Sequence, residues 1–130
     1  MNTDRRTAPK PPIIAFALVA DALFVVLFAA LGRSSHAREA TFVGLVETAW
    51  PFLVGLAVVW LAARVWRAPL RIVRSGVPLW VGTVAIGMLL RALTGAGTAM
   101  PFVIVATVSV GVFLLGWRGI AVLFQRALRR

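Results

Sequence analysis

Four long apolar runs, separated by short polar segments, dominate the hydrophobic pattern of the chain. A helix needs about 20 mainly apolar residues to cross the hydrocarbon core of a bilayer. Four runs have a suitable length, and they occupy residues 12–32, 41–65, 77–93 and 100–117. The short connections between them make consecutive helices antiparallel neighbours. The pattern therefore predicts an all-α integral membrane bundle of four transmembrane helices.

Two basic segments flank this predicted transmembrane domain, which covers residues 12–117. Residues 1–11 form a basic N-terminal segment, and residues 118–130 form a basic tail. The tail mixes apolar residues with arginines, a composition typical of an amphipathic extension that lies at the membrane interface.

The composition supports a membrane protein and excludes several kinds of site. Hydrophobic residues make up 61% of the chain, whereas soluble domains have about 45–50%. There is no cysteine, which excludes disulfides and thiolate metal sites. The formal net charge of +10 would suggest nucleic acid as a partner of a soluble protein. Here the charges lie between apolar runs, so we expect anionic lipids as partners and no nucleic acid.

The distribution of lysine and arginine predicts the orientation, because these residues concentrate on the cytoplasmic side of a membrane. Three of the 14 basic residues, Arg33, Arg38 and Arg91, fall opposite the N-terminus, and the other eleven fall on its side. We therefore expect a multi-pass cell-membrane protein with both termini in the cytoplasm. The arginines predicted to contact lipid head groups there are Arg67, Arg71, Arg74, Arg126, Arg129 and Arg130.

A heptad occurs in two similar copies, TAWPFLV at residues 48–54 and TAMPFVI at residues 98–104. Each copy precedes an apolar run that ends in Trp-Arg, so the two copies suggest parallel repeats of one helical hairpin; chance similarity is the alternative. Threonine caps helices well and proline suits the first turn. We therefore interpret Thr48, Pro51, Thr98 and Pro101 as cap or kink residues, and the second helix begins near either Thr41 or Thr48.

Three ionisable residues fall inside the predicted spans, where a charge costs about 2.5–3.5 kcal/mol at the bilayer centre. Asp21 lies near the middle of the first span, while Glu47 and Arg91 lie in the outer parts of the second and third. Two interpretations of this polar cluster remain open. Either the carboxylates pair with Arg91 in a structural clasp, or the three residues line a pocket used for transport. A third possibility is that one of them faces a partner protein.

The predicted outer loop carries Arg33 and His36. A lone histidine without a neighbouring set of ligands does not make a metal site, so we expect no metal and no cofactor. The serines beside His36 are too close to it in sequence for a catalytic triad to be presumed. No catalytic constellation can be argued from this chain, and we expect that it is not an enzyme.

Several of these segments together resemble a known family. The residues are Asp21, GRSSH at 32–36, ETAWPFLVG at 47–55, MLLR at 88–91 and TGAGTAMPFVIVA at 94–106. The chain is similar to the bacterial and archaeal membrane family called domain of unknown function 3054, from about Ile13 to Trp117. The resemblance implies a small integral membrane protein without an assigned activity. It transfers no catalytic or binding residue.

Three functions follow as hypotheses. The first is an accessory or scaffold subunit of a membrane complex, with a larger membrane protein or a second copy as its partner. The alternative is a small transporter or channel that uses Asp21, Glu47 and Arg91. An intramembrane enzyme acting on lipid is the third and weakest hypothesis, because one histidine and two carboxylates provide few catalytic groups.

Overall fold

The structure, a computed structural model, describes residues 9–35 and 41–129. Four α-helices and two short helical turns make up this part of the chain, and it contains no strand. The elements are α2 (Pro11–Ser35), α3 (Phe42–Ala62), the 3-10 turn η1 (Val65–Arg67), the π-helical turn η2 (Ile72–Gly76), α4 (Val77–Leu93) and α5 (Met100–Arg129). Each α-helix is long and apolar enough to cross a membrane, α4 together with the preceding turn. The predicted all-α bundle of four membrane-spanning helices is confirmed.

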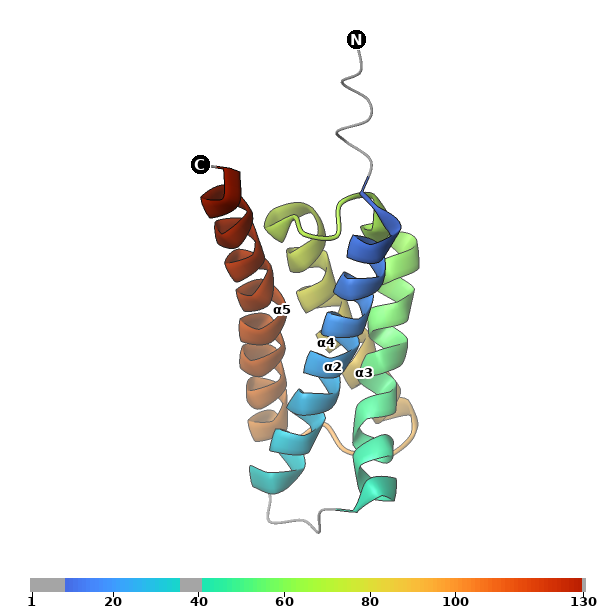
Figure 1. The fold of residues 1–130 in the computed structure, drawn as a ribbon. Coiled ribbons are helices and arrows are strands. Elements are labelled where there is room, and N and C mark those ends of the chain that lie inside the picture. Colours follow the sequence, from blue (N-terminus) through green and yellow to red (C-terminus); the bar gives the residue numbers. More distant parts are fainter. Residues whose placement is uncertain (1–8, 36–40, 130) are drawn as a thin grey trace.

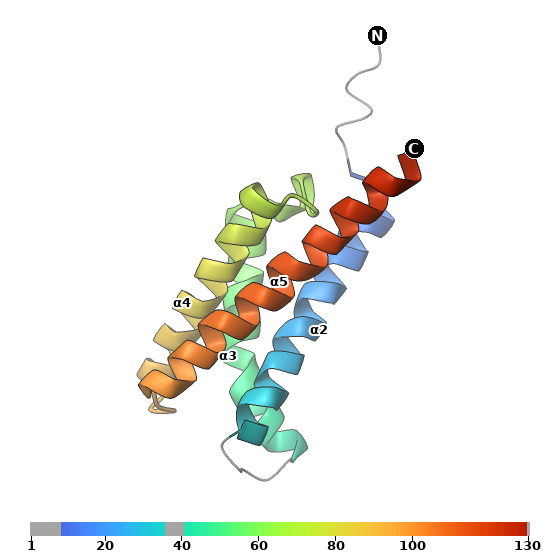
Figure 2. The same ribbon diagram turned by 90° about the vertical axis from the view of Figure 1, so that its left-hand side faces the viewer.

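The helices run up and down and contact one another in a closed ring (Figure 1). α2 packs on α3, α3 on α4, α4 on α5, and α5 back on α2. Figure 2 shows α5 lying against both α4 and α2. We call the end that holds the start of α2, residues 63–76 and the end of α5 the terminal end (Figure 1). The opposite end holds the start of α3 and residues 94–99.

The two similar heptads occupy different positions in their helices. α3 begins at Phe42 and is capped by Thr41, whose side-chain oxygen accepts a hydrogen bond from the Gly44 N–H (3.0 Å). Thr48 and Pro51 therefore lie inside the helix. α5 begins at Met100, so its proline does lie in the first turn. The first backbone bond of α5 runs from the Val103 N–H to the Ala99 carbonyl, so Thr98 is not the cap.

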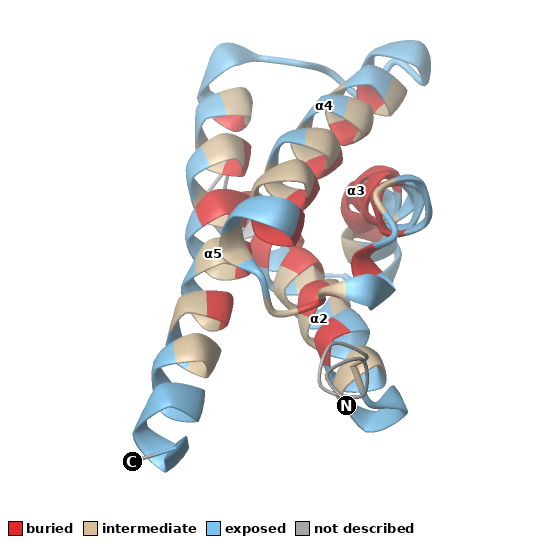
Figure 3. Cartoon of the chain, turned by 90° about the horizontal axis from the view of Figure 1, so that it is seen from above, coloured by how far each residue is buried: buried red, intermediate tan, exposed pale blue. Residues whose placement is uncertain are grey.

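The centre of the bundle is aromatic and close-packed. The rings of Phe28, Phe52 and Phe102, from three different helices, have centroids 4.9 to 6.0 Å apart. α4 reaches this group through Gly87, which faces the Phe52 ring. Buried positions form a stripe on the inward side of each helix (Figure 3). The outward sides expose large apolar side chains such as Leu23, Leu61 and Val108, as expected of a surface that contacts lipid.

Gly87→Ala should destabilise the protein although alanine is the better helix former. A Cβ at Gly87 would lie less than 3 Å from atoms of the Phe52 ring, and that ring is held between Phe28 and Phe102. Overpacking of this kind costs about 1–3 kcal/mol. At Gly116 a Cβ would meet nothing within 4 Å, so Gly116→Ala should stabilise α5 by about 0.5–1 kcal/mol. Denaturation in bicelles measures both changes, and equal effects would contradict the packing of α3 on α4.

Candidate functional site

A fully buried carboxylate marks the candidate site. Asp21 lies on α2 and its side chain is 0% exposed. It follows Pro11 by ten residues, about 15 Å along the helix axis, which is about half the thickness of the hydrocarbon core. A charge at this depth is stable only when it is paired and hydrogen-bonded.

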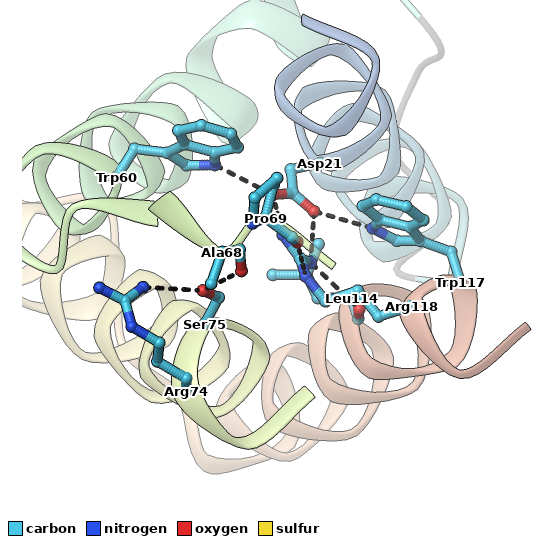
Figure 4. Close-up of polar contacts among 9 residues, drawn as sticks. All are labelled: Asp21, Trp60, Ala68, Pro69, Arg74, Ser75, Leu114, Trp117 and Arg118. Atoms are coloured by element: carbon cyan, nitrogen blue, oxygen red, sulfur yellow. Dashed lines mark hydrogen bonds and ion pairs between the residues drawn. The ribbon is translucent and has the colours of Figure 1, made fainter. Parts of the chain in front are cut away.

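Four N–H groups from two other helices supply those partners (Figure 4). Arg118 on α5 binds the carboxylate with both terminal nitrogens, Nη1 to Oδ1 at 2.8 Å and Nη2 to Oδ2 at 2.7 Å. The indole Nε1 of Trp117, also on α5, donates to Oδ1 (2.8 Å), and that of Trp60 on α3 donates to Oδ2 (3.0 Å). We call Asp21, Trp60, Trp117 and Arg118 the Asp21 cluster. A carboxylate has about four acceptor positions, so the hydrogen-bonding capacity of Asp21 is filled.

The guanidinium of Arg118 is equally enclosed. Its side chain is 0% exposed, and Nε donates to the Pro69 carbonyl (2.8 Å) in the connection between α3 and α4. Nη1 also approaches the Leu114 carbonyl at 3.2 Å. The connection is itself braced by Ser75, whose hydroxyl donates to the Ala68 carbonyl (2.6 Å; Figure 4). The Asp21 cluster therefore ties three helices and this connection together through one charged pair.

A comparison with known families then identifies the chain. The family described as "Protein of unknown function (DUF3054)" matches residues 18–121, which is most of the 130 residues. The chain belongs to the DUF3054 family. The predicted resemblance is confirmed, and the matched region includes all four residues of the Asp21 cluster. No curated protein and no solved structure matches this chain.

The structure of this DUF3054 protein corrects the predicted polar cluster. Arg91 does not pair with Asp21. Its Nε donates to the Gly97 carbonyl (2.9 Å) and its Nη2 to the Ala96 carbonyl (3.0 Å), both at the opposite end of the bundle. Its guanidinium also lies over the Phe102 ring, 4.2 Å from the centroid. Glu47 is exposed in the second turn of α3. Asp21, Glu47 and Arg91 therefore do not form one site.

Sequence reasoning missed Arg118 because it ended the fourth span at Trp117 and read the following arginines as anchors. α5 instead continues to Arg129 without a break, so Arg118 lies within the helix, where the Pro69 segment covers it. The sequence nevertheless contained one indication that the partner of Asp21 could lie near the terminal end. Asp21 lies ten residues from the start of α2, so a long arginine side chain near the terminal end can reach it as easily as one from the opposite end.

The two Trp-Arg pairs of the suspected hairpin repeat also differ. Trp117 and Arg118 lie in α5 and bind Asp21, whereas Trp66 and Arg67 lie in η1 and are exposed. The indole that binds Asp21 from the first hairpin belongs to Trp60, one and a half turns earlier in the chain. The similar sequences thus serve different structural purposes in the DUF3054 chain.

The remaining predicted site residues fall in three groups. Thr48 and Pro51 are buried in α3, while Thr98 and Pro101 are exposed at the start of α5. The predicted head-group arginines Arg67, Arg71, Arg74, Arg126 and Arg129 are exposed near the terminal end. His36, Arg130 and the side chain of Arg33 lie outside the described residues. Within the described residues, no group of three or more potential metal ligands occurs.

Proposed function

We propose that this DUF3054 protein is an accessory or scaffold subunit that docks on a larger membrane protein through the outward side of α3. We call this side the Glu47 face. Its exposed residues are Val43, Val46, Glu47, Trp50, Val54, Val58 and Leu61. Apart from Glu47 the face is apolar, and it runs along the whole length of α3.

The single observation that carries the proposal is the exposed carboxylate of Glu47. α3 has 21 residues, about 30 Å of helix, which matches the hydrocarbon core of a bilayer. Glu47 follows Phe42 by five residues, so it lies about 8 Å inside the end of the helix. It makes no hydrogen bond or ion pair with any of the described residues. An acidic group that faces lipid at this depth is costly, and a cationic side chain of a partner helix would neutralise it.

The Asp21 cluster supports a structural rather than a catalytic role for the interior. Every acceptor position of Asp21 is occupied by a donor from the chain itself, so none remains for a substrate. A second candidate, transport, is favoured by the presence of an ion pair at membrane depth. Transport would require Arg118 to leave Asp21 during the cycle. Glu47 and Arg91 do not lie in the same site as Asp21, so the predicted three-residue transport pocket is not supported.

Glu47→Gln should release the partner. The tagged full-length protein is purified from its native membranes in mild detergent, and bound proteins are quantified by mass spectrometry. We expect a stoichiometric larger membrane protein with the native chain and at least a tenfold loss with Glu47→Gln, because tenfold corresponds to about 1.4 kcal/mol. Arg67→Gln is the matched control, since Arg67 is an exposed charge at the other end of the bundle.

Two results would contradict the proposal. One is a partner that Glu47→Gln retains as well as the native chain does. The other is a native chain that purifies alone and, after reconstitution, carries a solute flux that Asp21→Asn abolishes. The second result would favour the transport candidate.

A further inference from the structure

A second surface, on a different side of the bundle, has the properties of a lipid site. α2 and α5 diverge toward the terminal end (Figures 1 and 3), and a groove of about 490 Å³ lies between them. Phe16, Ala20 and Phe24 line it from α2, and Trp117, Ile120 and Phe124 line it from α5. Phe16, Ile120 and Phe124 are 62 to 71% exposed, so the groove opens outward. We call it the α2–α5 groove.

Aromatic contacts between α2 and α5 hold the walls of the groove in place. Phe16 packs edge-on against Trp117 with ring centroids 5.7 Å apart, and Phe24 packs on Phe113 at 5.4 Å. Trp117 is further held by its hydrogen bond to Asp21. A preformed apolar groove of this size falls in the range of small-molecule sites, about 300–1,000 Å³.

The length of the groove matches one leaflet of a bilayer. Its lining runs from Ile13 to Phe24, eleven residues or about 16 Å of helix, and the hydrocarbon core is about 30 Å thick. A smaller hollow of about 250 Å³ continues along α2 to Leu27. A transmembrane partner helix would need a contact surface across both leaflets. A single acyl chain needs only this depth.

The rim of the groove is polar and basic. Gln125 is its polar lining residue, and Arg129 lies one turn further along α5 on the same side of the helix. Lys10 lies one turn before the lining residue Ile13, and Arg71 follows the lining residue Leu70; all three basic side chains are exposed. The acidic side chains of the described residues are Asp21, which is fully buried, and Glu47, which is near the opposite end. Because neither of these two carboxylates lies at the rim, the positive charge there attracts a phosphate.

We propose that the α2–α5 groove binds one anionic phospholipid from the leaflet at the terminal end. One acyl chain occupies the groove, and Lys10, Arg71 and Arg129 contact the phosphate. This site is independent of the Glu47 face, because α3 contributes no residue to the groove. An apolar chain in the groove would also shield Trp117 and, behind it, the Asp21 cluster from other contacts.

Filling the groove should remove the bound lipid. The full-length protein is reconstituted in nanodiscs that contain phosphatidylcholine and phosphatidylglycerol in equal amounts, and retained lipids are counted by native mass spectrometry. We expect one retained phosphatidylglycerol on the native chain and at least a tenfold lower occupancy in Ala121→Phe, because Ala121 lines the groove. Ala85→Phe is the matched control, since Ala85 is an exposed residue on α4.

The rim has its own test in the same assay. Lys10→Gln combined with Arg129→Gln should equalise retention of the two lipids, whereas Arg67→Gln should keep the preference for phosphatidylglycerol. Equal retention of both lipids by the native chain would overturn the proposal. So would equal effects of Ala121→Phe and Ala85→Phe, or a second copy of the chain retained in place of the lipid.

Discussion

Arg118→Leu is expected to lower the free energy of unfolding by about 3–5 kcal/mol, the usual cost of removing one partner from a buried ion pair. The substitution leaves the Asp21 carboxylate at 0% exposure with two indole N–H groups but no positive charge. It also leaves the Pro69 carbonyl without the Nε donor that joins α5 to the connection between α3 and α4. Reversible denaturation in bicelles measures the change.

Arg126→Leu is the matched control for this prediction. Arg126 lies on α5 about two turns after Arg118 and is exposed, so its loss should change stability by no more than about 0.5 kcal/mol. Arg118→Lys should fall between the two, because lysine keeps the charge but cannot bind the carboxylate with two parallel N–H groups. If Arg118→Leu and Arg126→Leu were equally stable, the Asp21 cluster would be absent in the membrane.

Coupling between the two charges separates an ion pair from two unrelated buried residues. Asp21→Leu combined with Arg118→Leu should cost less than the sum of the single changes by about 1–3 kcal/mol, because the double variant contains no isolated charge. It should remain below the native stability, since the indoles of Trp60 and Trp117 both lose their acceptor. Strict additivity would show that the charges do not interact.

Arg91→Leu is expected to have the second-largest effect, about 3 kcal/mol. Arg91 is 7% exposed and donates two hydrogen bonds to carbonyls of the loop between α4 and α5. Hydrogen bonds from charged groups contribute about 1.5–3 kcal/mol each, and the position over the Phe102 ring adds a cation–π term. The loop contains Gly95 and Gly97 at positive φ, so these bonds hold a backbone path that residues other than glycine rarely adopt.

The same denaturation assay tests whether Arg91 acts separately from the Asp21 cluster. Arg91→Leu and Asp21→Asn share no partner in the contacts described, so their effects should add to within about 0.5 kcal/mol. Arg67→Leu is the control for loss of an exposed arginine. A coupling of 1 kcal/mol or more would restore the pairing that the sequence suggested and contradict the arrangement at the two ends of the bundle.

Together these contacts describe a small bundle in which the interior charges hold helices and a loop together. Asp21 and Arg118 join α2 to α5 near the terminal end, and Arg91 secures the loop at the opposite end. The surfaces left for interaction are then the outward ones, the Glu47 face on α3 and the α2–α5 groove. The first suits a partner helix with a cation, and the second suits an anionic lipid.

The architecture of this protein follows from its sequence alone. Apolar runs of the length of a bilayer allow one structure, the helix that satisfies its own backbone hydrogen bonds, and short connections make the helices antiparallel neighbours. The spans expected at 77–93 and 100–117 accordingly begin at the observed residues. The sequence alone also showed that segments such as ETAWPFLVG resemble the DUF3054 family, and the family match confirmed this resemblance.

Which charges meet depends instead on how the helices pack. Depth along a helix can be counted from the sequence, but the direction in which each side chain points depends on how the helices rotate and pack. Asp21 could be placed at mid-membrane, yet its choice of Arg118 over Arg91 required α5 to continue past Trp117 and residues 63–76 to fold over the end of the bundle. Glu47 likewise faces outward because packing turned the other side of α3, with Thr48 and Phe52, toward its neighbours.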